Sequence, residues 1–230
     1  MHGYKKYSAQ HTFGHIPNGT DKIFIGAGIL VYEKIKDDYL ILLGKDKIYE
    51  QYTAMDGCLK KKHVNKCNAL QLTAQHEIFE ESVGIVYLRL MDIDQGNNYV
   101  DISGHLGGEN MGKYYRIYII RVPKNKITAR QCKDHIKIAS GEGYDTSLRE
   151  TVALDKFSLK NLLLSGILQA TGDFATTTIT GEYVVIYERT VDVIKKVCKK
   201  NIFVRQNKII NIISHEKSMR ILLAMKKLAL

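Results

Sequence analysis

Apolar residues of the 230-residue chain gather in short runs separated by polar, turn-forming residues. The runs KIFIGAGILVYE (22–33) and DYLILLGK (38–45) are typical of β-strands, and the polar residues between them predict a hairpin. Further strands are predicted in IVYLRLMDI (85–93), NYVDISGH (98–105) and KYYRIYIIRV (113–122). Strands that follow one another in hairpin-like pairs indicate a sheet with antiparallel neighbours.

The second half of the chain mixes strands with helices. Residues 146–168 contain a short strand followed by a helix, and EYVVIYERT (182–190) is consistent with another strand or with the start of the helix that follows. Helical patterns follow in 190–200 and 215–229. This mixed order predicts an α+β fold or a mixed α/β sandwich.

One predicted helix, ALQLTAQHEIFEESV (69–83), carries an unusual acidic strip. At about 100° per residue, Glu77, Glu80 and Glu81 share a strip between two apolar stripes. Like charges at this spacing repel, so at the edge of a core they would take up protons or bind a cation. Carboxylate oxygens suit hard cations such as Mg²⁺ or Mn²⁺.

The net charge of +10 is unevenly distributed. Residues Val191–Leu230 hold ten Lys and Arg against Asp192 and Glu216, so this segment alone carries a net charge of +8. Such a basic tail favours polyanionic partners such as RNA, polyphosphates or an anionic membrane surface. The alternative is a solvated surface that keeps the protein soluble.

Several classes of protein are excluded by composition. The apolar runs fall short of the roughly 18 residues of a membrane span, and the N-terminal residues lack the apolar core of a secretory signal. The four cysteines, Cys58, Cys67, Cys132 and Cys198, show no C-x-x-C spacing and predict reduced thiols in a cytoplasmic protein. A composition rich in Lys, Ile, Asn and Tyr suggests an AT-rich genome, as in some viruses; the compartment would then be the host cytoplasm.

The acidic helix and its flanks resemble the Nudix hydrolase family. The signature of that family is a glycine-led loop and a helix reading R-E-U-x-E-E, where U is aliphatic, with a glycine shortly after. Here the helix reads HEIFEE (76–81), and YTAMDGCLKK (52–61) stands where the glycine-rich turn is expected. The residues FIGAGILVYEKIKDDYLILLGKDK (24–47) resemble the first strands of the family, and RETVALDKFSLKNLL (149–163) resembles its closing strand and helix.

This resemblance implies an α/β/α sandwich with a mixed sheet. It also implies a division of the chain into an N-terminal arm (1–22), a Nudix-like catalytic domain (23–168) and a basic strand and helix extension (169–230).

The resemblance further implies a reaction and roles for particular residues. Members of the family cleave a pyrophosphate bond in a nucleoside diphosphate linked to another group. Glu77, Glu80 and Glu81 would hold Mg²⁺ or Mn²⁺ against the phosphates, and one of them or Glu150 would deprotonate the attacking water. The substrate-binding residues would come from the loop and the tyrosines before it: Gly57, Lys60, Lys61, Lys62, Lys66 and Tyr52, with Tyr49 as a second base-stacking ring.

The sequence departs from the family pattern at three places. His76 replaces the arginine of the signature, and we expect it to be a structural residue packed beside Phe79. About five extra residues separate Gly57 from His76. One residue is inserted before the following Gly84, for which we also expect a structural role.

Three hypotheses for the substrate stay open. The first is removal of the 5′ cap of mRNA, with the basic tail binding the RNA body, as in viral decapping enzymes. The second is hydrolysis of a small nucleotide, a nucleotide sugar, a dinucleoside polyphosphate or an inositol pyrophosphate. The third is a catalytically weak Nudix-fold binding module, against which the retained glutamate trio argues.

Overall fold

The computed structural model describes residues 22–60, 62–64, 66–93, 98–103, 112–141, 144, 146–206, 208–212 and 214–228. The predicted arm at 1–22 lies outside the described residues except for Lys22. The first strands, β1 (Ile23–Ile35) and β2 (Asp38–Asp46), form the predicted antiparallel hairpin. Because their apolar side chains face both sides of the sheet, the middle of β1 is buried throughout.

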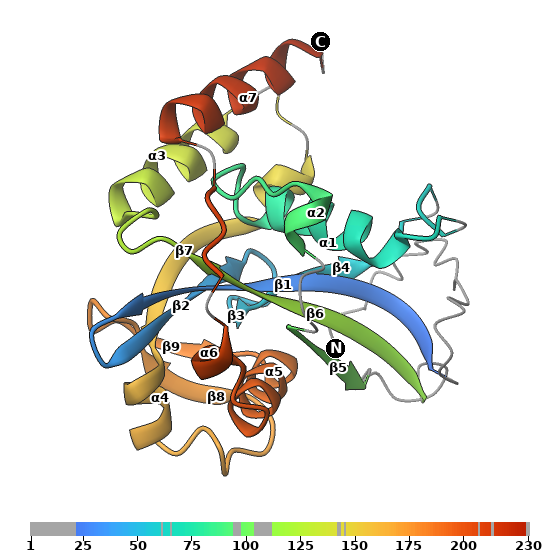
Figure 1. Cartoon of the computed structure of the whole chain (residues 1–230). Coiled ribbons are helices and arrows are strands. Elements are labelled where there is room, and N and C mark those ends of the chain that lie inside the picture. The colour runs from blue at the N-terminus through green and yellow to red at the C-terminus, as the bar shows by residue number, and fades with distance from the viewer. Residues whose placement is uncertain are drawn as a thin grey trace, which may run out of the picture.

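Nine strands of the described residues form one mixed sheet (Figure 1). The order is β5-β6-β1-β2-β3-β9-β8, with β4 beside β1 and β7 beside β2. The pairs β1–β6 and β3–β9 are parallel, and the other pairs are antiparallel. The remaining strands are β3 (Tyr52–Thr53), β4 (Met55–Cys58), β5 (Tyr99–Ser103), β6 (Lys113–Val122), β7 (Thr151–Ser158), β8 (Phe174–Thr177) and β9 (Tyr183–Ile186).

One edge of β1 pairs with two different strands along its length, because β1 and β2 diverge in this part of the sheet. Residues 26–29 of β1 pair with β4, whereas residues 31–35 pair with β2. Strand β2 continues beyond this point and pairs with β3 instead. The short β3 and β4 therefore fill the space where β1 and β2 diverge.

Helices cover both faces of the sheet, as the predicted α/β/α sandwich requires (Figure 1). Alternate residues of β1 enter two cores: Ile29 and Val31 face one, and Leu30 and Tyr32 face the other. The first core is covered by α1 (Ala69–Glu81), α2 (Leu90–Ile93), α3 (Ala129–Ala139) and α7 (His215–Leu228). The second core is covered by α4 (Leu159–Leu164), α5 (Glu188–Lys199) and α6 (Ile202–Arg205).

Helix α1 confirms the predicted acidic helix and ends in a defined C-terminal motif. The backbone N–H of Gly84 donates to Phe79 O (2.7 Å), and that of Val83 donates to Glu80 O (3.0 Å). These two bonds form a Schellman motif, in which Val83 adopts the left-handed conformation with φ of 53°. The motif stops the helix directly after the glutamates.

One prediction of secondary structure was wrong, and one helix was not predicted. Residues 85–93 are not a strand: Leu90–Ile93 form α2, and the preceding residues have no regular structure. Helix α3 was not predicted, although the sequence carries its start signal. Thr128 caps the Gln131 N–H, and the Gln131 side chain accepts from the Thr128 N–H, which makes a capping box.

The first part of the predicted extension after residue 168 belongs to the same sheet as the residues before it. Strand β9 pairs with β3, and β8 pairs with β9. Buried residues of α5, including Val193 and Ile194, pack in the second core. Across the described ranges, no helix has both the length and the apolar character needed to traverse a lipid bilayer.

Candidate active site

Strand β4 and helix α1 bring the glutamates against the sheet, and Gly57 makes this approach possible. Glu77 is buried, with 8% of its surface exposed. A Cβ atom at Gly57 would overlap the Glu77 carboxylate, so no other residue fits here without moving it. The predicted glycine therefore makes room for the Glu77 carboxylate, and its role in substrate binding stays a prediction.

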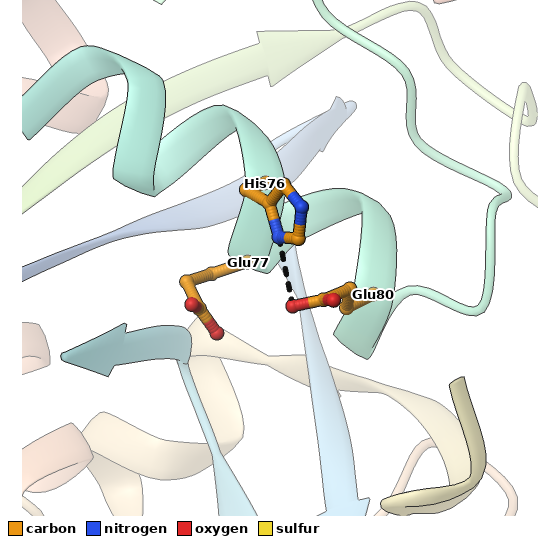
Figure 2. Close-up of side chains that lie close together, drawn as sticks. All are labelled: His76, Glu77 and Glu80. Atoms are coloured by element: carbon orange, nitrogen blue, oxygen red, sulfur yellow. Dashed lines mark ion pairs between the residues drawn. The ribbon is translucent and has the colours of Figure 1, made fainter. Parts of the chain in front are cut away.

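The first group of ionisable side chains consists of His76, Glu77, Glu80 and Lys60, and we call it the lysine cluster. Single ligand atoms of His76, Glu77 and Glu80 lie within 4.8 Å of one another, and Figure 2 shows the three side chains converging. The Lys60 ammonium lies among them: its Nζ is 2.5 Å from Glu80 Oε2, 2.6 Å from His76 Nδ1 and 3.4 Å from Glu77 Oε1. His76 Nδ1 is also 2.9 Å from Glu80 Oε2.

Contacts in the lysine cluster hold Glu80 in its charged form. Burial alone would raise the pKa of Glu80, but hydrogen bonds from His76, Lys60 and Ser147 outweigh it and lower this pKa to about 2. Burial likewise acts to lower the pKa of Lys60, yet the Glu77 and Glu80 charges raise it. Glu80 and Lys60 are therefore a stable ion pair at neutral pH.

The second group consists of Asp56, Glu81 and Arg189, and we call it the arginine cluster. Asp56 comes from β4, Glu81 from the last turn of α1, and Arg189 from the first turn of α5. Arg189 Nη2 donates to Asp56 Oδ1 (2.5 Å). The arginine plane lies over the Tyr115 ring, with Cζ 4.3 Å from its centroid.

Two carboxylate oxygens of the arginine cluster have no hydrogen-bond partner within the described part of the chain. These are Asp56 Oδ2 and Glu81 Oε2, and both are buried; the Nε–H donor of Arg189 is likewise buried and without a partner among the described residues. Burial and the charges of Asp56, Glu77 and Glu150 raise the pKa of Glu81 well above its ordinary value. Buried acceptors without donors are costly, so this pair of oxygens is suited to a proton or a cation.

Glu77 belongs to the lysine cluster and also interacts electrostatically with Asp56 of the arginine cluster. Burial raises its pKa to about 7, with the Glu80 and Asp56 charges adding to this effect and Lys60 opposing it. The pKa of Asp56 is raised as well, because burial outweighs its attraction to Arg189. The site therefore exchanges protons near neutral pH and can exchange them for a metal ion.

A cavity of about 380 Å³ opens beside the arginine cluster. Glu81, Asp56 and Arg189 line one part of it. The ring of Tyr49, 74% exposed, lies at the cavity with Tyr187, so two aromatic rings stand near the carboxylates. The other lining residues are Asp46, Gln51 and Thr53.

The structure corrects two predictions of single residues. Tyr52 is fully buried, its hydroxyl donates to Asp155 Oδ2 (2.6 Å) and its ring packs on Phe157, so it is not placed to stack on a base. His76, expected to be a structural residue packed beside Phe79, makes polar contacts with Glu80 and Lys60. It belongs to the lysine cluster, because the helix turns its side chain toward Glu80, one turn further on.

The other predicted residues are distributed around the two clusters. Lys62 Nζ lies 3.4 Å from His76 Nε2, and Lys66 is exposed at the start of α1. Glu150 is exposed, and its charge acts on Glu81. Gly84 has a φ of 75° and lies in the Schellman motif. Lys61 lies outside the described residues.

Sequence reasoning missed Asp56 and Arg189. Asp56 directly precedes Gly57 in the loop that the resemblance singled out, so a carboxylate there was a readable signal. No local pattern marks Arg189, because it follows Asp56 by 133 residues and meets it only through the packing of α5.

Among known proteins, similarity was found only in the comparison with solved structures. No protein-family model and no curated protein matches the chain. A mutT/nudix family protein from Listeria innocua aligns with 80% of this chain and 97% of its own, at 13% identity and a TM-score of 0.37. An Ap4A hydrolase from C. elegans aligns with 56% of this chain and 95% of its own, at 14% identity and a TM-score of 0.34. The binary complex of a C. elegans Ap4A hydrolase aligns with 44% of this chain and 68% of its own, at 12% identity and a TM-score of 0.32. At TM-scores below 0.5, we base no argument on these likenesses.

Proposed function

We propose that the protein is a divalent-metal-dependent pyrophosphohydrolase of the Nudix type, acting on a nucleoside-diphosphate-linked substrate. One observation carries this proposal: the carboxylates of Asp56 and Glu81 leave buried oxygens unpartnered beside a cavity of about 380 Å³. A protein gains nothing from such oxygens unless a cation or a donor group binds to them.

The residues present fit Mg²⁺ or Mn²⁺. Both ions prefer carboxylate oxygens and water, and the available donors are carboxylates at the wall of a cavity. Glu77 and Glu81 would hold the ion. Glu80 would join them only by exchanging its contact with Lys60. When bound, the ion would neutralise phosphate charge and make a coordinated water more acidic.

Side chains of this protein would do the remaining work. Lys60, paired with Glu80, and Arg189, paired with Asp56, supply positive charges that would stabilise phosphate charge. Tyr49 and Tyr187 offer ring faces to a nucleobase at the cavity. Glu150, exposed and electrostatically coupled to Glu81, is our candidate for accepting the proton of the attacking water.

Capped RNA is our first candidate substrate, because the basic excess would bind the RNA body. Part of that charge is already engaged: Lys195 donates to Ala170 O, and Lys196 donates to Asp101 O (2.9 Å). Lys199 and Lys200 are exposed at the end of α5 and available to phosphates. Small nucleotides, dinucleoside polyphosphates and inositol pyrophosphates form the second class of candidate, for which the cavity alone would suffice.

Product analysis tests the proposal. The purified chain is incubated with Mg²⁺ or Mn²⁺ and either cap-labelled RNA or a panel of nucleoside diphosphate compounds. Release of 7-methyl-GDP establishes decapping, and cleavage of small compounds alone keeps the hydrolase but removes RNA. Absence of any product with metal still bound favours the binding module.

The proposed binding of RNA is tested separately by charge removal instead of truncation. Deleting residues 191–230 would remove core residues such as Val193 and Ile194, and would unfold the protein. We expect the Lys199→Gln/Lys200→Gln variant to weaken RNA binding and to reduce the slope of its salt dependence by about one unit for each phosphate that is no longer neutralised. Lys36→Gln/Lys124→Gln, at two exposed lysines outside the tail, is the matched control. Equal binding by both variants would mean that Lys199 and Lys200 do not contribute to RNA binding.

A further inference from the structure

Asp56 occupies a position that the chain has built around its side chain. It lies opposite Gly28 in the β1–β4 pairing, and a Cβ atom at Gly28 would overlap Asp56 Cβ. Only 2% of the Asp56 side chain is exposed. Burying a carboxylate costs several kcal/mol unless its oxygens are matched, so this placement calls for partners on both oxygens.

Only one of the two oxygens has a partner within the described residues. Oδ1 accepts from Arg189, and Oδ2 accepts from nothing. Asp56 Oδ2 and Glu81 Oε2 are thus two unpartnered, buried oxygens on residues that line the same cavity. The two carboxylates are close enough for their charges to interact.

Arg189 is held in place by more than its ion pair. Its guanidinium lies 4.3 Å from the Tyr115 ring centroid and 5.6 Å from that of Tyr187. Gly26 allows the first of these contacts, because a Cβ there would overlap the Tyr115 ring. An arginine stacked in this way fixes the orientation of the carboxylate that it binds.

We infer that Asp56 is a further metal ligand that binds the cation of Glu81 through Oδ2, and that Arg189 is the positioning residue that holds Oδ1. This inference rests on the proposed function and adds two residues to it. It also makes α5, which follows residue 168, a part of the site. Metal-binding carboxylates are commonly held by a hydrogen bond on the oxygen that does not face the ion, and Arg189 supplies that bond.

The competing explanation is that Asp56 only neutralises a buried arginine. Under that explanation Asp56 and Arg189 matter for stability, and metal affinity is unchanged in any variant that folds. The two explanations therefore differ in metal affinity measured without substrate.

The experiment is a Mn²⁺ titration of the full chain, followed by electron paramagnetic resonance of the free ion. We expect Asp56→Asn to weaken Mn²⁺ affinity at least tenfold, and Arg189→Lys to weaken it about tenfold. Asp37→Asn and Arg130→Lys, at exposed positions away from the site, should leave the affinity unchanged. Thermal unfolding confirms that each variant is folded.

A double variant covers the case in which Asp56→Asn fails to fold. Asp56→Asn/Arg189→Gln removes both charges of the buried Asp56–Arg189 ion pair, so neither partner is left without the other, and it should fold even if the single variant does not. Wild-type Mn²⁺ affinity in any folded variant lacking the Asp56 carboxylate would overturn the inference, as would a wild-type chain that binds no Mn²⁺. Metal binding that depends on Asp56, without hydrolysis of any nucleotide, would reject the proposed function and keep the metal site.

Discussion

The lysine cluster and the arginine cluster differ in how the charges of their carboxylates are compensated. In the lysine cluster, the Lys60 ammonium contacts all three acidic or imidazole groups. In the arginine cluster, Arg189 contacts one oxygen of Asp56, and two buried oxygens stay without a partner in the described structure. Both clusters include glutamates of α1, and both lie next to β4.

The difference separates two meanings of an acidic motif. A carboxylate that forms an ion pair with a lysine, as Glu80 does with Lys60, has its charge neutralised by the protein itself and needs no further cation. A buried carboxylate with a free oxygen carries an energetic cost that a bound cation removes. The helix signature in the sequence does not distinguish these cases, because Glu80 and Glu81 are neighbours in it.

The largest expected effect comes from the arginine cluster. Glu81→Gln should reduce the proposed pyrophosphate hydrolysis about 10³-fold, because it removes an oxygen that we propose as a metal ligand, and loss of such a ligand costs several kcal/mol in the transition state. Its thermal stability should equal or exceed that of the wild type, because an amide is less costly to bury than an ionised carboxylate. Rate and melting temperature are measured together, with Glu216→Gln on the exposed face of α7 as control. Full activity in the Glu81→Gln protein would remove the metal assignment.

Gly57→Ala should have the next largest effect, because its Cβ would displace the Glu77 carboxylate that joins the clusters. We expect a loss of about 1–3 kcal/mol in the free energy of unfolding and at least a tenfold loss of activity. The comparison variant is Gly44→Ala, whose new methyl would first meet the Thr151 methyl at 3.3 Å. Urea unfolding and initial rates measure both; an alanine tolerated equally at the two positions would contradict the close approach.

The pH dependence of stability should carry opposite signs for Glu77 and Glu80. The pKa of Glu77 is raised to about 7, so its contribution to stability is complete below its ordinary value of 4.5 and is lost as pH rises through 7. The pKa of Glu80 is lowered to about 2, so its contribution is present above 4.5 and is lost as pH falls through 2.

For Glu77 the effect is on the order of 2–3 kcal/mol between pH 4.5 and 8 in metal-free protein. Urea unfolding in the presence of a chelator at several pH values measures it. Glu77→Gln should flatten this slope, and Mg²⁺ should offset it by binding the ionised form. A Glu77→Gln protein with the wild-type slope would show that another group is responsible.

The smallest expected effect is in the lysine cluster. Lys60→Met removes the ammonium and should destabilise the metal-free protein by about 1–2 kcal/mol, because its charge-assisted hydrogen bonds are removed. It also leaves His76, Glu77 and Glu80 free to bind an ion, so Mn²⁺ should restore more stability than in the wild type. Thermal unfolding with and without Mn²⁺ measures this difference. The control is Lys62→Met, which removes an exposed lysine nearby. Identical Mn²⁺ responses would mean that Lys60 does not occupy a cation position.

Local patterns predict the elements of this fold better than they predict the site. The apolar runs of β1 and β2 and the helical period of α1 are properties of short segments, and the predicted strands and helix are confirmed. The prediction for Tyr52 was wrong because a tyrosine in a strand gives the same pattern on a buried and on an open face. The pairing of Asp56 with Arg189 depends on β9 and α5 returning to the sheet beside β3, which no short segment encodes.

The C-terminal end of α1 has a consequence for how the protein is made. The Val83 carbonyl accepts from His135 Nδ1 (2.8 Å), and the Gly84 carbonyl accepts from Ser218 Oγ, so side chains from α3 and α7 finish the end of that helix. A ribosome that has just completed the glutamates has still to add more than half of the chain before these partners exist. The C-terminal end of the acidic helix therefore stays incomplete through most of translation, and its last side-chain partner, Ser218, is added near the end of synthesis.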